Sequence, residues 1–421
     1  MTTTAALSDL QQQARDDAFS LPLDQIDVTK PRLFQNDTVG HYFERLRRDA
    51  PVHWHHNNFY GGFWSVTRYA DIMAVDTNHA LYSSDWTQGG IAIFNAPPGE
   101  QMPMFIAMDP PKHDDQRKAV SPIVAPGNLA QMEVIIRERT ARVLDSLPRN
   151  EPFDWVQRVS IELTTQMLAT LFDFPFEDRH KLTRWSDVST SIPGTDKIVE
   201  SMEARDIELG ECLAYFTRLW NERVNQPPRG DLVSMLAHAP ATRDMSPREY
   251  LGNLMLLIVG GNDTTRNSMS SGVLALHQHP EQMAKLRANP ALIDSLVPEI
   301  IRWQTPLAHM RRTALADAEL GGQHIKKGDK VVMWYVSGNR DSTAIERADE
   351  FIIDRARPRQ HLSFGFGIHR CVGNRLAEMQ LRVLWEEILK RFDRIEVVGE
   401  PQRSMSNFVR GFTHLPVVIP G

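Results

Sequence analysis

The sequence predicts a mainly α fold with a minor β portion, formed by residues 1–421 as a single domain. Two observations support the fold class. Helical periodicity dominates the middle of the chain, whereas segments that alternate between apolar and polar residues are short and lie toward its two ends. A third observation supports the single domain, because the sequence shows no internal repeat, no low-complexity segment and no linker.

The first predicted element is a β-hairpin. Residues 51–67 alternate in hydropathy around a turn at Asn57-Asn58, and a helical period then runs from 69 to 76. Three histidines on the first strand have no Cys or carboxylate at ligand spacing beside them, so we predict solvated side chains and not a metal site. These histidines are His53, His55 and His56.

A long loop separates the hairpin from the helical middle. Residues 84–111 are rich in Gly, Pro and Met without a sustained period, which is typical of a functional loop and predicts a lid. Pro227 to Gly230 interrupts the following helices, and Asp231 is predicted to cap the next one. The helical patterns cover 129–146, 155–171, 207–225 and 249–277, the last of them long and apolar enough to cross a core.

The final third mixes strands with a helix. Residues 325–335 alternate like a strand, and 408–419 predict a terminal hairpin around Gly411. Between them, a helical pattern runs from 374 to 392.

Composition and charge exclude several classes of function. Lys and Arg total 47 against 53 for Asp and Glu, a net charge of −6, so nucleic acid is not an expected partner. No apolar run approaches the about 18 residues that span a bilayer, and residues 1–20 do not resemble a secretory signal. With only two cysteines, Cys212 and Cys371, the chain is expected in the reducing cytoplasm.

The segment 364–373 is the strongest candidate for a site. It places three glycines and Cys371 directly before the helical pattern that begins at Asn374. The N-terminal end of a helix favours thiolate over thiol, and a thiolate is a nucleophile or a metal ligand. The alternative is an inert buried cysteine, which is the commoner fate of an isolated free thiol.

The spacing of this segment resembles the haem-binding loop of the cytochrome P450 superfamily. The resemblance implies haem b with Cys371 as the axial thiolate ligand. It also implies the corresponding fold, with the haem between the long central helix and the helix that follows the cysteine. The loop residues that carry the match are Phe364, Gly367, His369, Cys371 and Gly373. The resemblance implies that Phe364, Gly365 and Gly373 contact the haem.

Two further motifs match the same family. Glu299 and Arg302 lie at i and i+3 on one helix, and the resemblance implies that they join Arg355 in a brace on the haem side of the core. Within the long helix, Asp263 and Thr264 match an acid–alcohol pair. The resemblance makes Asp263 the proton relay and Thr264 the hydrogen-bonding alcohol of dioxygen activation.

The resemblance also suggests groups that hold the haem propionates. His113 and Arg117 are spaced to share one helix face, and Arg312 and His361 fall where other propionate partners are expected. Surface charge is the alternative for each residue. Because the chain has no glycine-rich flavin or nicotinamide motif, electrons are expected from a ferredoxin with its NAD(P)H-dependent reductase.

Residues 256–270 are similar to the soluble bacterial alkane and fatty-acid terminal hydroxylases. This similarity predicts a monooxygenase that uses O2 to hydroxylate a hydrophobic linear substrate at its ω carbon. A terpenoid or steroid substrate, or a haem peroxygenase, is the alternative, although Asp263-Thr264 argues against the peroxygenase. The predicted pocket residues, each of which could equally belong to the core, are Ile91, Ile93, Phe94, Leu256, Val259, Gly260, Leu307, Met310 and Phe408.

Overall fold

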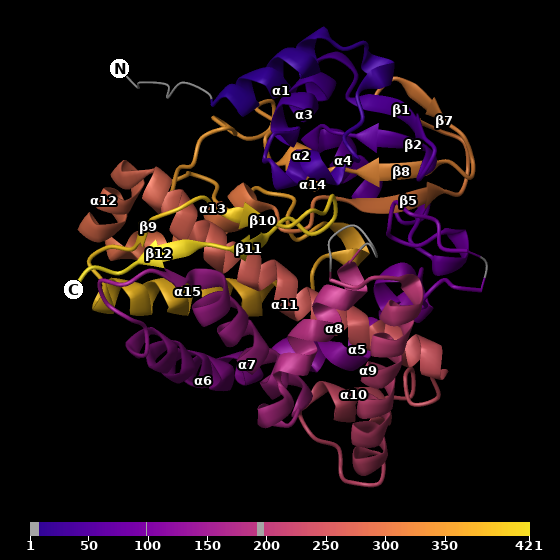
Figure 1. Cartoon of the computed structure of the whole chain (residues 1–421). Helices are drawn as coiled ribbons and strands as arrows, with labels where there is room; N and C mark the ends of the chain where they lie inside the picture. Colours follow the sequence, from indigo (N-terminus) through magenta and orange to yellow (C-terminus); the bar gives the residue numbers. More distant parts are fainter. Residues whose placement is uncertain (1–7, 98, 192–197) are drawn as a thin grey trace.

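A computed structural model describes residues 8–97, 99–191 and 198–421 (Figure 1). Helices form most of the molecule, and the predicted fold class is confirmed. The central helix α11, Pro247–Gln278, packs against α7, α8, α9, α13 and α15. These five helices are Glu162–Phe172, His180–Thr190, Met202–Arg223, Ile293–Gln304 and Asn374–Arg391.

The N-terminal hairpin belongs to a five-stranded sheet. Its strands β1 and β2 pair around the predicted turn, and β2 then pairs in parallel with β8. The sheet order is β1-β2-β8-β5-β3, so segments about 250 residues apart in sequence lie side by side. The strands are Val52–Asn57, Gly61–Val66, Lys330–Met333, Met310–Ala314 and Tyr82–Ser83.

Helices near the N-terminus cover this sheet, as the indigo ribbons of Figure 1 show. A cluster of buried side chains joins them to the sheet, with Phe34 and Phe43 packed against Trp334. The helices are α1 Asp9–Ser20, α2 Pro31–Gln35, α3 Val39–Asp49 and α4 Tyr69–Asp76, and the short α14 Tyr335–Gly338 follows β8.

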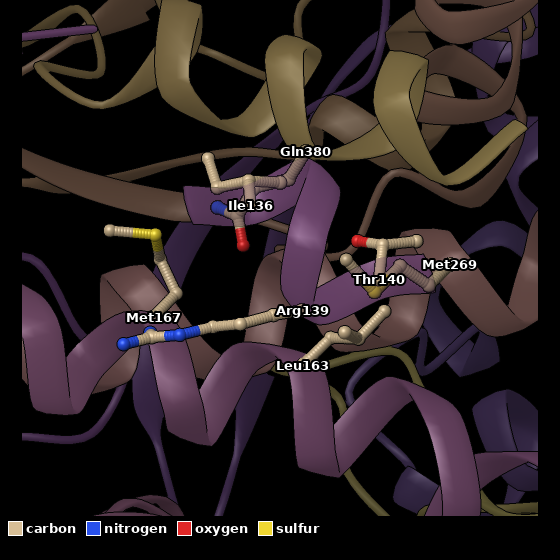
Figure 2. Close-up of a pocket in the computed structure, with 7 residues that line it drawn as sticks. All are labelled: Ile136, Arg139, Thr140, Leu163, Met167, Met269 and Gln380. Carbon is tan, nitrogen blue, oxygen red and sulfur yellow. The ribbon is translucent and has the colours of Figure 1, made fainter. Parts of the chain in front are cut away.

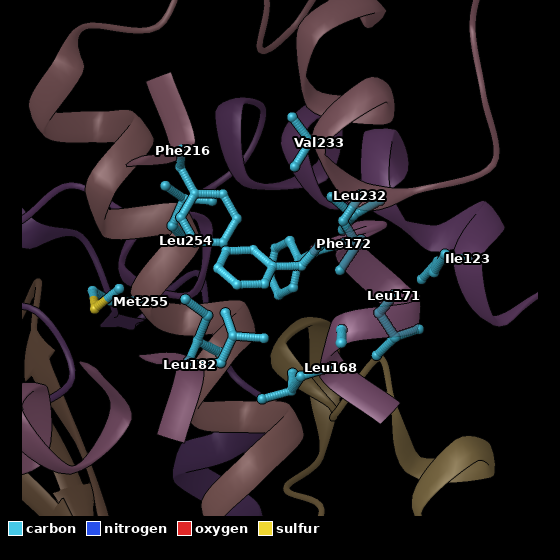
Figure 3. Packing of buried hydrophobic residues seen from close by; sticks show 14 of the residues in the cluster. Ile123, Leu168, Leu171, Phe172, Leu182, Phe216, Leu232, Val233, Leu254 and Met255 are labelled. Atoms are coloured by element: carbon cyan, nitrogen blue, oxygen red, sulfur yellow. The ribbon is translucent and has the colours of Figure 1, made fainter. Parts of the chain in front are cut away.

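The helical core surrounds Phe172. Figure 3 shows its ring beside Phe216 and Leu254, and the two phenyl rings meet edge to face at 5.2 Å between centroids. Asp231 accepts a hydrogen bond from the Ser234 amide and caps α10, as predicted. The remaining helices are α5 Lys112–Val120, α6 Pro126–Asp145, α10 Leu232–His238 and α12 Pro280–Ala288.

The predicted terminal hairpin around Gly411 is wrong. Strand β11 (Phe412–His414) pairs with β10 (Gln402–Arg403), whereas β12 (Pro416–Val418) pairs with β4 (Phe153–Asp154) and β9 (Glu396–Val397). The chain around Gly411 packs on the central helix, because Asn267 accepts the Phe412 amide at 3.0 Å. The strand predicted over 325–335 is also interrupted, since β7 (Gln323–Ile325) pairs with β6 (Ala318–Leu320) and a turn precedes β8.

The prediction for the strand histidines holds only in part. His55 is buried, with its Nε2 3.2 Å from Asp27 Oδ1, so it is not a solvated side chain. His56 is exposed. No group of three or more potential metal ligands occurs in the described part of the chain.

No single helix within the described ranges is long and apolar enough to cross a membrane. Two consecutive helical segments, Lys112–Val124 and Pro126–Asp145, are long and apolar enough when taken together, but the chain bends by 49° between them.

Candidate active site

The cysteine segment folds back on itself before α15. The Cys371 amide donates to the Phe364 carbonyl at 2.8 Å, which closes the loop. Gly365 and Gly367 adopt φ of 63° and 66°, a region that favours glycine. A Cβ at Gly367 would also lie 2.5 Å from the backbone oxygen of Asp76. The glycines are therefore needed for this loop geometry, and α15, which follows Cys371, packs on α11.

Electrostatics distinguish the two cysteines. Burial raises the pKa of the Cys371 thiol, but a hydrogen bond from the Gly373 backbone and the charges of Arg117 and Arg370 act in the opposite direction. Burial raises the pKa of Cys212 well above its ordinary value, and no opposing group lies near it in the part of the chain that the structure describes. Only Cys371 therefore has neighbours that stabilise a thiolate.

Four cationic or imidazole side chains gather beside the cysteine segment. The His113 and His369 rings lie 4.3 Å apart, and the positive charges of Arg312 and Arg117 act on His369. His113 Nε2 and both ring nitrogens of His369 are buried and have no hydrogen-bond partner among the residues that the structure describes. Each imidazole carries at least one N–H group, so these buried ring nitrogens, together with the two arginines, fit an anionic group such as a haem propionate. Arg312 is held here by an ion pair with Asp76 at 2.8 Å.

His361 does not join this group. Its ring packs on Phe364 at 5.4 Å between centroids, and its Nδ1 accepts the Ser363 amide. Burial, with Arg302 and two other arginines nearby, lowers the pKa of His361 to about 3. His369, which was not predicted as a propionate partner, lies against His113 instead. Its position two residues before Cys371 was the available signal.

The middle of α11 presents one open face. Val259, Gly261 and Thr264 are half-buried and Gly260 is exposed, whereas Ile258, Asn262, Asp263 and Thr265 are buried. A Cβ at Gly260 would meet no atom within 4 Å, whereas one at Gly261 would press on Leu168. The two glycines therefore serve different purposes, an open surface at one position and close helix packing at the other.

The acid–alcohol pair is fixed within this helix. The Thr264 hydroxyl donates to the Gly260 carbonyl at 2.9 Å. Asp263 is fully buried, and its Oδ1 accepts from Ser186 at 3.1 Å and lies 3.0 Å from Arg266. Burial raises the pKa of Asp263 to about 6, although Arg266 lowers it. Its Oδ2 has no partner within the described ranges, so one lone-pair direction remains available.

Some predicted pocket residues come together and others do not. Ile91, Leu307, Met310 and Phe408 pack in one apolar cluster, and the Ala308 amide donates to the Phe408 carbonyl at 2.8 Å. Ile93 belongs to a different cluster beneath the N-terminal helices. Phe94 is on the surface, with its ring against Phe59, and Leu256 packs at the edge of the helical core.

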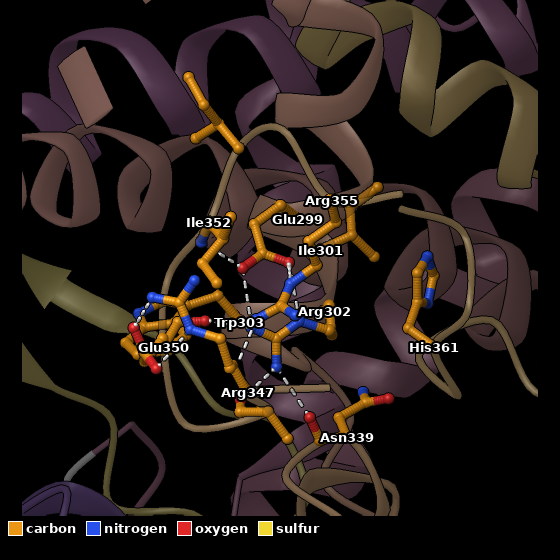
Figure 4. Close-up of polar contacts among 12 residues, drawn as sticks. Glu299, Ile301, Arg302, Trp303, Asn339, Arg347, Glu350, Ile352, Arg355 and His361 are labelled. Carbon is orange, nitrogen blue, oxygen red and sulfur yellow. Dashed lines mark hydrogen bonds and ion pairs between the residues drawn. The ribbon is translucent and has the colours of Figure 1, made fainter. Parts of the chain in front are cut away.

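The predicted brace is present as a buried network (Figure 4). Arg302 donates to both oxygens of Glu299 at 2.8 Å, and Arg355 donates to Glu299 Oε2 at 2.9 Å. Arg302 also donates to the carbonyls of Asn339 and Ala348. The network thus fixes α13 to the chain that leads into the cysteine segment.

A separate small pocket lies between α6, α7, α11 and α15 (Figure 2). Its lining includes Arg139, Met269 and Gln380, and it contains none of the predicted site residues. Arg139 in this lining already donates to the Gln166 carbonyl and to Thr170.

A helical fold, a loop that stabilises a thiolate and buried imidazole and guanidinium groups beside it fit a haem-thiolate protein. The family model for Cytochrome P450 matches residues 39–416. The chain belongs to the cytochrome P450 family and is a P450 monooxygenase, whose family cofactor is haem with a thiolate ligand.

Curated relatives cover nearly the whole chain. The chain is 38% identical to linalool 8-monooxygenase from Pseudomonas putida, with 94% of this chain and 99% of the relative covered. It is 33% identical to a methyl-branched lipid omega-hydroxylase from Mycobacterium bovis, over 89% of this chain and 90% of the relative.

Solved structures agree with the fold. Cytochrome P450-153 from Novosphingobium aromaticivorans superposes with a TM-score of 0.87 at 48% identity, covering 93% of this chain and 99% of that chain. CYP153D17 from Sphingomonas sp. gives 0.88 at 51% identity, with coverage of 95% and 100%.

Proposed function

We propose that this P450 monooxygenase hydroxylates linear alkanes or fatty acids, chiefly at the terminal carbon. The observation that carries the proposal is the apolar cluster of Ile91, Leu307, Met310 and Phe408. An apolar wall of this kind suits a hydrocarbon chain without polar groups to recognise. The methyl-branched lipid omega-hydroxylase among the relatives supports oxidation at a chain end.

Each site residue has a role in this proposal. Haem b would supply oxidation of a C–H bond by O2 and two electrons, which a ferredoxin and its NAD(P)H-dependent reductase would deliver. The Cys371 thiolate would hold the iron, and His113, His369, Arg117 and Arg312 would hold the propionates. Asp263 would carry a proton toward the reaction site, and the Thr264 hydroxyl would orient it. The loop residues Phe364, Gly365 and Gly373 would shape the seat of the haem.

The ligand assignment is tested by exchanging each thiol for a hydroxyl. Cys371→Ser should abolish the carbon monoxide difference spectrum of a thiolate-ligated haem, because serine is a poorer ligand. Cys212→Ser should retain it, because Cys212 is an isolated core residue on α9. A normal spectrum in the Cys371 variant would refute the assignment.

Terminal selectivity requires a shaped pocket. A terminal C–H bond is stronger than its methylene neighbour by a few kcal/mol, and each 1.36 kcal/mol in a barrier is about tenfold in rate. An unrestrained chain would therefore react internally. Walls from Val259, Leu307 and Met310 would have to admit the methyl group and exclude the next carbon.

Product analysis by gas chromatography tests this regiochemistry. With ferredoxin and reductase supplied, medium-length alkanes and fatty acids should give mainly terminal alcohols. Leu307→Ala should raise the subterminal share, because it removes part of one wall. Leu389→Ala, at a partly buried leucine in another cluster, is the matched control. Mainly subterminal alcohols from the parent enzyme would refute the proposal.

A terpenoid is the second candidate substrate, favoured by the identity with linalool 8-monooxygenase. Titration of the purified enzyme with linalool, linear alkanes and fatty acids, followed through the haem spin state, distinguishes the two. Tighter binding of linalool than of every linear compound would favour the second candidate.

A further inference from the structure

Two cations of the five-stranded sheet lie buried beneath residues 88–95. Arg311 on β5 and Lys330 on β8 are each 5% exposed. Neither is paired with a carboxylate in the described part of the chain. Burial lowers the pKa of Arg311 to about 10, and burial together with Arg311 lowers the pKa of Lys330 to about 8. Buried cations without a counter-ion are unfavourable, so they need a structural reason.

Lys330 satisfies backbone carbonyls from two separate segments. Its ammonium donates to the Tyr60 carbonyl at 2.7 Å and to the Ile93 carbonyl at 2.8 Å. Tyr60 lies in the hairpin turn and Ile93 lies in the long loop that was predicted as a lid. The lysine therefore joins the hairpin to the loop at one point.

Arg311 holds the segment 88–95 of this loop at both ends of the segment. Its guanidinium donates to Asn95 Oδ1 at 2.6 Å and to the Gln88 carbonyl at 3.3 Å. Its backbone amide donates to the Ile91 carbonyl at 2.9 Å. Gly89, with φ of 110°, passes so close to the guanidinium that an added Cβ would collide with it. The loop is thus shaped around this side chain.

Strand β5 contacts both the segment 88–95 and the apolar cluster proposed as the pocket wall. Met310 belongs to the apolar cluster with Ile91, and Arg311 is the next residue of β5. Successive side chains of a strand point to opposite faces, so one strand can present a wall to the pocket and a cation to the loop. A shift of the loop would move Ile91 relative to Met310.

We propose that Lys330 and Arg311 are positioning residues that fix residues 88–95 on the sheet and thereby set which carbon of the substrate is oxidised. This inference rests on the proposed function for its substrate class. The clamp itself rests on the contacts above. A methionine at position 330 would fill the space but would leave two buried carbonyls without donors.

The test compares Lys330→Met with Lys327→Met, the same substitution at an exposed position of the adjoining turn. Hydrogen exchange of the full-length holoenzyme should be at least about tenfold faster in residues 88–95 of the Lys330 variant alone, because the loop opens more readily. The ratio of subterminal to terminal alcohol should also rise severalfold in that variant. Its carbon monoxide spectrum should remain that of the parent.

Thr313→Val provides a milder second variant. The Thr313 hydroxyl donates to the Gln88 carbonyl at 2.8 Å, and its removal keeps both cations. In Thr313→Val, the exchange of residues 88–95 and the ratio of subterminal to terminal alcohol should both rise, but less than in Lys330→Met. If Lys330→Met does not fold, these two measurements on Thr313→Val test the inference.

Two results would overturn the inference: unchanged exchange of residues 88–95, or faster exchange with an unchanged product ratio. The exchange measurement needs no substrate. If the parent enzyme forms mainly internal alcohols, the proposed terminal selectivity fails, whereas a further shift of products in Lys330→Met still supports the clamp.

Discussion

Asp263 is a buried carboxylate whose hydrogen-bonding capacity is only partly used. Ser186, Asn262 and Arg266 all lie at Oδ1, and no described residue bonds to Oδ2. Burial raises its pKa to about 6, so both protonation states are accessible close to neutral pH. A group that passes protons on is most effective under that condition.

Asp263→Asn should slow turnover by about 100-fold, within the range typical of a lost general acid or base. Substrate affinity, measured by spin-state titration, should change little. Asp187→Asn is the matched control, because Asp187 binds the same arginine at 2.7 Å but is partly exposed. Equal losses in the two variants, or full activity in Asp263→Asn, would contradict the relay.

The sequence indicated that histidines near Cys371 belong to the candidate site, but it did not indicate which of them points toward His113. His361 and His369 both lie within ten residues of Cys371, and spacing alone does not separate them. The 3-10 turn Gly367–His369 turns the second ring toward His113, whereas the first packs on Phe364. This choice depends on backbone turns that periodicity does not encode.

The link between α13 and the segment before Cys371 depends on one carboxylate. Glu299 is completely buried, accepts from Arg302 and Arg355, and also accepts the Ile352 amide at 2.7 Å. Removing one partner of a buried ion pair leaves the opposite charge uncompensated, which costs about 3–5 kcal/mol.

Glu299→Gln should therefore lower the free energy of unfolding by about 3–5 kcal/mol and reduce haem incorporation. Glu350→Gln is the matched control. The Glu350 side chain pairs with the exposed Arg347, so its replacement should change the free energy of unfolding far less than Glu299→Gln does. Chemical denaturation followed by tryptophan fluorescence measures both, and equal stability of the two variants would show that the brace is not structural.

Strand pairing was the least predictable feature of the elements. The hairpin over 51–67 was predicted correctly because its partners are adjacent in sequence. The strand Pro416–Val418 instead pairs with residues 153–154, more than 260 positions earlier. Local alternation shows that a segment is a strand, but the choice of a distant partner depends on the packing of the whole chain.

At the scale of the whole molecule, the helix predicted over 249–277 was confirmed as α11. Helices from earlier in the chain (α7, α8 and α9) and from later in the chain (α13 and α15) pack on it. Its length and apolar content made it predictable. The sequence did not show that β8 would insert beside β2 and bring Lys330 beneath the lid loop. That contact joins distant segments and is a property of the complete fold.

Histidines held neutral in the interior make the stability of the whole molecule depend on pH. His309 is buried between Trp334 and Phe408, with Nδ1 3.1 Å from the Asn407 carbonyl. Burial lowers the pKa of His309 to about 4. The unfolded chain, with a pKa near the ordinary value of about 6.5, binds more protons below that pH than the folded protein. The stabilisation is therefore complete above pH of about 6.5 and is lost as the pH falls toward 4.

His309→Asn removes this titration while its amide can still donate to the Asn407 carbonyl. Chemical denaturation at several pH values should show the parent's free energy of unfolding approaching that of the variant between pH of about 6.5 and 4, by about 3 kcal/mol at 1.36 kcal/mol per pKa unit. His56→Asn, the same substitution at an exposed histidine, is the control and should leave the pH dependence of the free energy of unfolding as it is in the parent. Curves for the parent and His309→Asn that stay parallel over this range would contradict the argument, because both proteins share every other titrating group.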